Sequence, residues 1–170
     1  MGRGSDMAAL KPGTTAPEIS LNDVSGKHTS LSDALKKGPV LATFFKVSCP
    51  TCQFTLPFIQ RMHEMFGGQN FTFLGISQDG PRDTREFMNE FGLTFPVLVD
   101  DRGYPASNKY GLTNVPSVFL IAPDGKIQAT AVGFAKSDLE EMTAVAARST
   151  GKPASSLFKP GEVIPDYKPG

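Results

Sequence analysis

The chain has no tryptophan, and among its 170 residues only two are cysteine and two are histidine. A zinc site uses about four soft ligands, so it would need every cysteine and histidine present. Lysine plus arginine number 17, as do aspartate plus glutamate, and the net charge is zero. A neutral chain has no field that attracts a nucleic-acid backbone or an anionic membrane surface. We therefore expect neither nucleic acid nor a membrane as a partner.

Long apolar runs are also missing. No stretch approaches the roughly 20 apolar residues that span a bilayer, and the N-terminus lacks the apolar core of a secretory signal. Residues 1–9 are typical of a disordered start or an expression-vector scar, because a Gly/Arg/Ser stretch precedes a second methionine, Met7. We expect a cytoplasmic protein if Met7 is the native start, and an extracytoplasmic one if a signal segment was trimmed.

The hydrophobic pattern predicts one mixed α/β domain over residues 10–150. Apolar strands alternate with amphipathic helices, which is typical of a largely parallel sheet covered on both faces. Hairpins at the two ends of this series add antiparallel edges. The last predicted helix begins with Ser137 as its cap. Residues 151–170 are rich in proline and glycine without periodicity, and we expect an extended tail on the surface or a disordered one.

Both cysteines lie in the segment FFKVSCPTCQFTLP, as Cys49 and Cys52. A disulfide that closes so short a loop stabilises a fold by about 2 kcal/mol, against about 5 kcal/mol for a 100-residue loop, so a structural staple is a poor use of this spacing. An apolar strand ends just before Cys49, and Pro50 suits the first position of a helix. The free N–H groups of Thr51 and Cys52 then point at the Cys49 sulfur and stabilise a thiolate. We expect Cys49 to attack a disulfide and the shielded Cys52 to resolve the product.

The strand, the CPTC motif and a helix with Pro57 five residues later resemble the thioredoxin superfamily. The segment YGLTNVPSVFLIAPDGKI resembles the part of that family that carries a cis-proline beside the dithiol, which makes Pro116 the candidate. The leading hairpin and the insertion over residues 77–101 resemble the TlpA/ResA-like, redoxin-type (AhpC/TSA) branch. The resemblance implies a thioredoxin-like three-layer sandwich and a thiol-disulfide oxidoreductase.

This resemblance also implies cofactor and partners. The redox centre would be the Cys49–Cys52 disulfide itself, with no other cofactor and no metal. Its partners would be a protein or small-molecule disulfide and an upstream thiol reductant or oxidant, and the protein would be a monomer or weak dimer. Val115 and Pro116 would present a backbone edge that pairs with the substrate chain.

Several positions depart from the family pattern. Ser48 stands where relatives usually have tryptophan. Thr43 and Thr55 stand where relatives keep the carboxylate that assists the resolving cysteine, and a threonine is no general base at neutral pH. Resolution by Cys52 would then rely on water, on Lys46 or on a residue distant in sequence. The alternative for Lys46 is a strand-end side chain that reaches solvent.

A thiol peroxidase is the second hypothesis. Peroxiredoxins place the reactive cysteine in a P-x-x-x-T/S-x-x-C frame, whose threonine and proline help to hold peroxide. If Cys52 is that cysteine, the two supporting positions are Cys49 and Phe45; if Cys49 is, they are Lys46 and Ala42. Both supporting groups are missing in either alignment.

A metal carrier is a third and weaker hypothesis. The available soft ligands are Cys49, Cys52, His28 and His63, and His63 would lie about 15 Å from the cysteines by helix rise. We expect solvent-exposed side chains at His28, His63, Asp100 and Asp101.

Overall fold

The computed structural model describes residues 9–170, so the expected disordered or vector-derived start at residues 1–9 lies, apart from Ala9, outside the described residues. A five-stranded sheet with the order β5-β4-β3-β6-β7 forms the centre of the molecule. The first three strands of this order are parallel, and β6 is antiparallel to both of its neighbours. The strands are β3 (Val40–Phe45), β4 (Thr72–Ser77), β5 (Val97–Val99), β6 (Ser117–Ile121) and β7 (Ile127–Val132).

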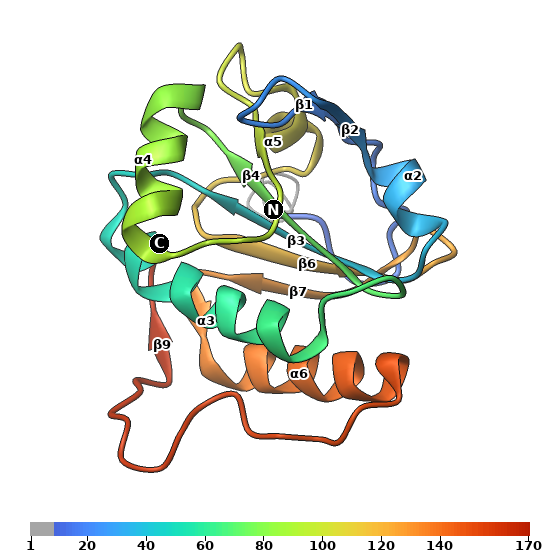
Figure 1. Ribbon diagram of the computed structural model, residues 1–170, viewed down its shortest axis with the longest axis vertical. Helices are drawn as coiled ribbons and strands as arrows, with labels where there is room; N and C mark the ends of the chain where they lie inside the picture. Colours follow the sequence, from blue (N-terminus) through green and yellow to red (C-terminus); the bar gives the residue numbers. More distant parts are fainter. Residues whose placement is uncertain (1–8) are drawn as a thin grey trace, which may run out of the picture.

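Helices cover both faces of the sheet, which confirms the predicted three-layer sandwich (Figure 1). One face carries α3 (Pro50–Phe66), α4 (Pro81–Phe91) and α6 (Lys136–Thr150). The other face carries α2 (Leu31–Leu35) and α5 (Pro105–Lys109). The predicted leading hairpin is present as β1 (Ser20–Asn22) and β2 (His28–Ser30), and it joins the sheet region through a bridge between Asp23 and Leu98.

Strand β3 explains why an apolar run leads to the cysteines. Leu41 and Phe45 pack under α3, while Ala42 and Phe44 pack on the opposite face. Both faces are buried because β3 lies between β4 and β6 in the middle of the sheet. A strand buried on both faces reads as a continuous apolar run, and it delivers the chain to the sheet edge in a fixed position.

Ser137 does not cap α6, and this prediction was wrong. The helix begins at Lys136, with Ala135 in the cap position and no side-chain cap bond. The Lys136 N–H instead donates to the carbonyl oxygen of Asp166 at 3.0 Å. That bond extends the pairing of β8 (Phe134–Ala135) with β9 (Tyr167–Lys168), so a remote segment satisfies the first free N–H group of the helix.

The segment after α6 follows an extended course, in red in Figure 1, past α6 and back through β9 to the beginning of α3. Leu157 has no exposed surface and Phe158 is 8% exposed, so this part of the chain contributes to the core. The ring of Phe158 lies at centroid distances of 5.1 Å from Phe58 and 6.0 Å from Phe134. The division into a domain over residues 10–150 and a tail over residues 151–170 stays a prediction.

Candidate active site

The two cysteines lie where β3 leads into α3. Pro50 occupies the first helical position, as predicted, and Cys49 is the residue that caps the helix. The Sγ atom of Cys49 accepts a hydrogen bond from the Cys52 backbone N–H at 3.1 Å. The positive end of the helix therefore points at sulfur, an arrangement that stabilises a thiolate.

The surroundings of the two thiols differ. Both are free, but Cys49 is partly exposed, whereas Cys52 has no exposed surface and belongs to the apolar cluster under α3. Burial raises the pKa of the Cys52 thiol, and the hydrogen bond with Cys49 and the charges of Cys49 and Asp79 raise it further. A backbone hydrogen bond at Lys46 opposes these effects only in part. The site thus holds one accessible thiol and one that is kept protonated inside the protein.

The loop before β6 meets the dithiol, because β6 is the neighbour of β3. The Val115–Pro116 peptide bond is cis, as the family resemblance implied. The Cys49 thiol donates to the carbonyl oxygen of Val115 at 3.5 Å. The Pro116 carbonyl oxygen accepts a bond from the Gly133 N–H at 2.8 Å, which ties this loop to the chain that leads into β8.

Lys46 and Thr51, two further predicted residues, lie beside the cysteines. The Lys46 side chain is exposed, and its carbonyl oxygen accepts a bond from the Cys49 N–H at 3.2 Å. Thr51 lies between the cysteines, and its hydroxyl donates to the carbonyl oxygen of Pro169 at 2.6 Å. The structure therefore brings the C-terminal segment onto the motif, a contact that sequence reasoning missed.

Asp79 is a second residue that sequence reasoning missed. It follows β4, the other neighbour of β3, and its Oδ2 accepts a hydrogen bond from the Val47 N–H at 2.8 Å. Its charge acts on the buried Cys52 thiol. The available signal was positional: parallel strands end at the same edge of a sheet, so an acidic residue after β4 must lie near the end of β3.

Neither threonine at the family's carboxylate positions supplies an acid or base. Thr55 is buried and donates to the Thr51 carbonyl oxygen at 2.7 Å within α3. Thr43 is fully buried on β3, and within residues 9–170 its hydroxyl has no hydrogen-bond partner. Asp79 is an acidic residue whose charge acts on Cys52.

The predicted exposure of His63 and Asp100 was wrong. His63 is half-buried, and its ring stacks edge-on against Phe73 at 5.4 Å and Phe95 at 5.7 Å. Asp100 is 1% exposed because its carboxylate accepts bonds from the N–H groups of Ala106 and Ser107 at the start of α5. His28 is exposed on β2, as expected. In the part of the chain that is described, no three potential ligands gather in a metal-binding group.

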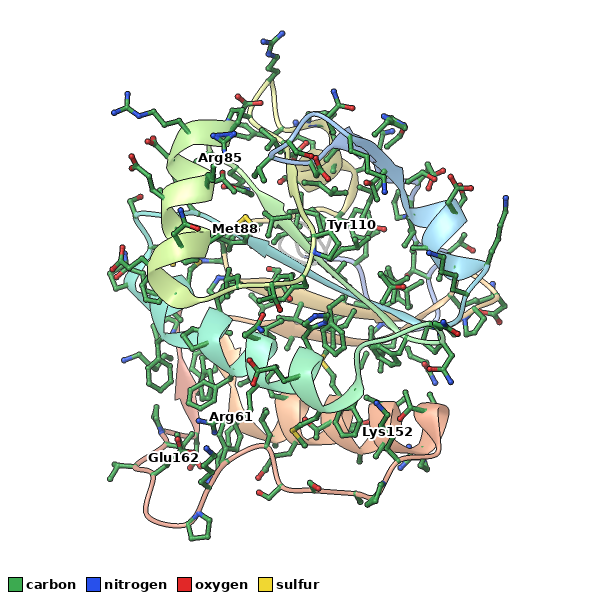
Figure 2. All side chains as sticks on the ribbon, in the orientation of Figure 1. Arg61, Arg85, Met88, Tyr110, Lys152 and Glu162 are labelled. Atoms are coloured by element: carbon green, nitrogen blue, oxygen red, sulfur yellow. The ribbon has the colours of Figure 1, made fainter. Side chains whose placement is uncertain are left out.

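A cavity of about 780 Å³ lies apart from the cysteines, between the hairpin, the start of α4 and the loop after β5. Its lining includes Asp23, His28 and Arg85 but neither cysteine. The Arg85 guanidinium, labelled in Figure 2, donates to the carbonyl oxygen of Val24 at 2.9 Å. The cavity contains none of the predicted site residues.

One related protein and two solved structures are similar to this chain. Thiol-disulfide oxidoreductase ResA of Geobacillus thermodenitrificans (strain NG80-2) is 30% identical, over 81% of this chain and 79% of that protein. The thioredoxin domain of a thiol-disulfide oxidoreductase from Bacteroides vulgatus has the same fold, with a TM-score of 0.71 and 26% identity over 81% of this chain and 98% of that one. Peroxidoxin BcpB from Mycobacterium tuberculosis shares the fold with a TM-score of 0.68, at 22% identity over 84% of this chain and 97% of that one.

A family model covers most of the domain. The AhpC/TSA family matches residues 12–130, a range that contains the dithiol, Asp79 and the cis-proline. The match and the shared thioredoxin fold agree with the branch that the leading hairpin and the insertion over residues 77–101 indicated. This chain therefore belongs to the AhpC/TSA family.

Proposed function

We propose that this thiol-disulfide oxidoreductase works through a division of labour in which Cys49 attacks and Cys52 resolves. The observation that carries the proposal is the difference in access: Cys49 is partly exposed at a helix N-terminus, and Cys52 is fully buried. A bulky disulfide can reach only the exposed sulfur. The thiolate is the reactive form of a cysteine, and the Cys49 sulfur accepts a hydrogen bond from the Cys52 N–H at the beginning of the helix.

The reaction has two exchanges. The Cys49 thiolate attacks one sulfur of the substrate disulfide, forms a mixed disulfide and releases the other sulfur as a thiolate that takes up a proton. Cys52 then loses its proton and attacks the Cys49 sulfur, which releases the second substrate thiol. Two electrons have passed to the substrate, and the Cys49–Cys52 disulfide remains until a thiol reductant restores it. The reverse sequence oxidises a substrate dithiol.

The second exchange needs a proton acceptor, because Cys52 is held protonated. Asp79 is the carboxylate whose charge acts on Cys52, and it is fixed by the Val47 N–H. We assign it the role that was considered for Lys46, whose side chain points to solvent. In our proposal a water molecule carries the proton from the Cys52 sulfur to the Asp79 carboxylate.

The proposed partners are a protein disulfide and an upstream thiol reductant or oxidant. Val115 and Pro116 present the backbone edge beside Cys49 that would bind the substrate chain.

The redox compartment in which the protein works decides the direction of electron flow. No helix within residues 9–170 has the length and apolar character of a membrane span. A reduction potential near about −270 mV would indicate a reductant, and one near about −120 mV an oxidant.

Trapping tests the assigned roles. The Cys52→Ser variant should accumulate mixed disulfides with a protein substrate through Cys49, since the resolving thiol is missing. The Cys49→Ser variant should form none, which non-reducing electrophoresis and mass spectrometry would show. Adducts that build up through Cys52 in the Cys49→Ser variant would reverse the assignment.

The peroxidase hypothesis finds no support in the site. Phe45, one of the two positions that would hold peroxide, is fully buried inside the sheet. The likeness to the peroxidoxin from Mycobacterium tuberculosis shows the fold alone. We expect oxidation of Cys49 by hydrogen peroxide in a stopped-flow instrument to be no faster than that of a free thiol, and a saturating rapid phase would reinstate the hypothesis.

A further inference from the structure

The C-terminal strap, residues 157–170, runs from a contact with Phe58 in the middle of α3 to Thr51 beside the dithiol. It begins with Leu157 and Phe158, which are buried against the core. Its middle is held by an ion pair between Arg61 of α3 and Glu162, with two bonds of 2.9 Å, and Figure 2 shows these side chains side by side. Arg61 also donates to the Leu157 carbonyl oxygen at 2.9 Å. These contacts fix where the rest of the strap must lie.

The last five residues of the strap lie on the reactive edge of the site. β9 pairs antiparallel with β8, with Tyr167 opposite Ala135 and Lys168 opposite Phe134. The Lys168 ammonium lies 5.3 Å from the ring centroid of Phe54. The pairing partner β8 lies between β7 and α6, and Phe54 lies in the first turns of α3.

The end of the strap reaches the motif itself. The Pro169 carbonyl oxygen accepts the bond from Thr51, the residue next to Cys52. Gly170 lies so close to Val115 that a Cβ at Gly170 would overlap the Val115 carbonyl oxygen. That oxygen is the acceptor of the Cys49 thiol. One short peptide segment therefore contacts both Thr51 of the motif and Val115, whose carbonyl oxygen bonds to the Cys49 thiol.

We propose that residues 166–170 occupy the peptide-binding edge of this site, so that an extended segment of a disulfide-bearing protein binds by displacing them. This inference rests on the proposed function. The strap and a substrate chain need the same groups, namely the backbone of Phe134–Ala135, the Thr51 hydroxyl and the Val115 carbonyl. The two occupants exclude each other, and the strap lowers the fraction of molecules that can bind a protein substrate.

The contacts of the strap also describe the partner. The edge takes an extended backbone, because β8 offers main-chain groups to an antiparallel strand. It takes a residue without a side chain at the position of Gly170, because a Cβ there would overlap the Val115 carbonyl oxygen. A cationic side chain over Phe54 is favourable. A small-molecule disulfide needs none of these groups and reaches the partly exposed Cys49 directly.

Removal of the end of the strap tests the proposal. A chain that ends at Ile164 keeps the buried anchors and the Arg61–Glu162 pair and loses only the covering residues. With dithiothreitol as electron source, kcat/KM for insulin disulfides should rise about fivefold, the gain expected if the strap is docked in roughly four molecules of five. The rate with hydroxyethyl disulfide should not change. Equal insulin rates for both chains, or a lower rate for the shortened one, would overturn the proposal.

A full-length variant guards against a folding defect. Gly170→Val should push the strap off Val115 and raise the insulin rate in the same direction, by a smaller factor. Val163→Ser is the matched control, since this strap side chain is 94% exposed, and it should leave both rates unchanged. If Gly170→Val behaves like Val163→Ser, the strap does not compete with the substrate.

Hydrogen exchange separates this inference from the proposed function. The Lys136 amide is protected by Asp166 while the strap is docked. In the Cys52→Ser variant trapped with insulin, that amide should exchange faster than in the free variant. If the Lys136 amide is equally protected in the trapped adduct, the inference about the strap is wrong and the proposed function is unaffected. If no variant traps or reduces insulin, the proposed function is wrong.

Discussion

The two sides of the dithiol offer opposite environments. On the outer side, the Cys49 thiol bonds to the Val115 carbonyl oxygen, and the neighbouring Thr51 hydroxyl bonds to Pro169 of the strap. On the inner side, Cys52 faces the apolar core, and the charge of Asp79 acts on it. One helical turn separates the two sulfurs in sequence, yet one is a surface group and the other a core group.

This difference shows that the two halves of a disulfide exchange depend on different parts of the structure. The first exchange requires access to Cys49, and in our proposal the strap limits that access. The second exchange requires removal of a proton from Cys52 in a low-polarity environment, and in our proposal Asp79 accepts that proton. Substitutions should therefore separate the two halves, and the predictions below test that separation.

The largest difference should appear in alkylation of the reduced protein. We expect iodoacetamide to modify Cys49 about a thousandfold faster than Cys52 at pH 7, because Cys52 is buried and its pKa is raised. Peptide mass spectrometry at timed intervals measures both rates. In denaturant the two rates should become equal, which serves as the control. If Cys49 and Cys52 are alkylated at comparable rates in the folded protein, the two thiols do not differ in accessibility and pKa as described.

The outer side should depend on an anchor far from the cysteines. Phe158→Ala removes a ring that packs against Phe58 and Phe134, and it should lower the free energy of unfolding by about 3–5 kcal/mol. Val163→Ala, in the same strap, should change it by less than about 0.5 kcal/mol. Urea denaturation measures both. If Phe158→Ala lowers the free energy of unfolding by no more than Val163→Ala does, Phe158 does not anchor the strap.

The inner side should depend on Asp79. Asp79→Asn should slow resolution of the mixed disulfide about tenfold at pH 7, because the proton acceptor is lost. The variant's rate should keep rising with pH as hydroxide takes over. If Asp79 acts only through its field, its removal lowers the pKa of Cys52 and resolution becomes faster instead. Asp83→Asn, an exposed change in the first turn of α4, is the charge-matched control and should have no effect.

The smallest effect concerns the other end of α3. Burial lowers the pKa of His63, and the charge of Glu64 opposes this only in part. Protonation thus favours the unfolded chain, so stability is complete above about pH 6.5 and falls as the pH drops through the folded-state pKa. His63→Gln should flatten the melting temperature between pH 7 and pH 5, while His28→Gln should not. If the melting temperature of His63→Gln depends on pH as that of the unchanged protein does, the loss of stability at low pH arises from other groups.

Local pattern was sufficient for most of the fold and for the reactive pair. The apolar run before Cys49, the proline after it and the helix-period aromatics were enough to predict β3, α3 and the position of the dithiol. The beginning of α6 was not predicted correctly, because the first N–H group of that helix, at Lys136, bonds to Asp166 in a distant segment.

The sequence by itself determined that a thiol pair stands at the start of a helix after a buried strand, since periodicity, Pro50 and Cys49 act within a few residues. Only the tertiary structure decided what surrounds that pair. Asp79 reaches the inner side through the parallel register of β4 with β3. The strap reaches the outer side through Arg61 and Glu162, which are 101 residues apart in the chain. Contacts between remote segments depend on packing of the whole domain, and no local pattern encodes them.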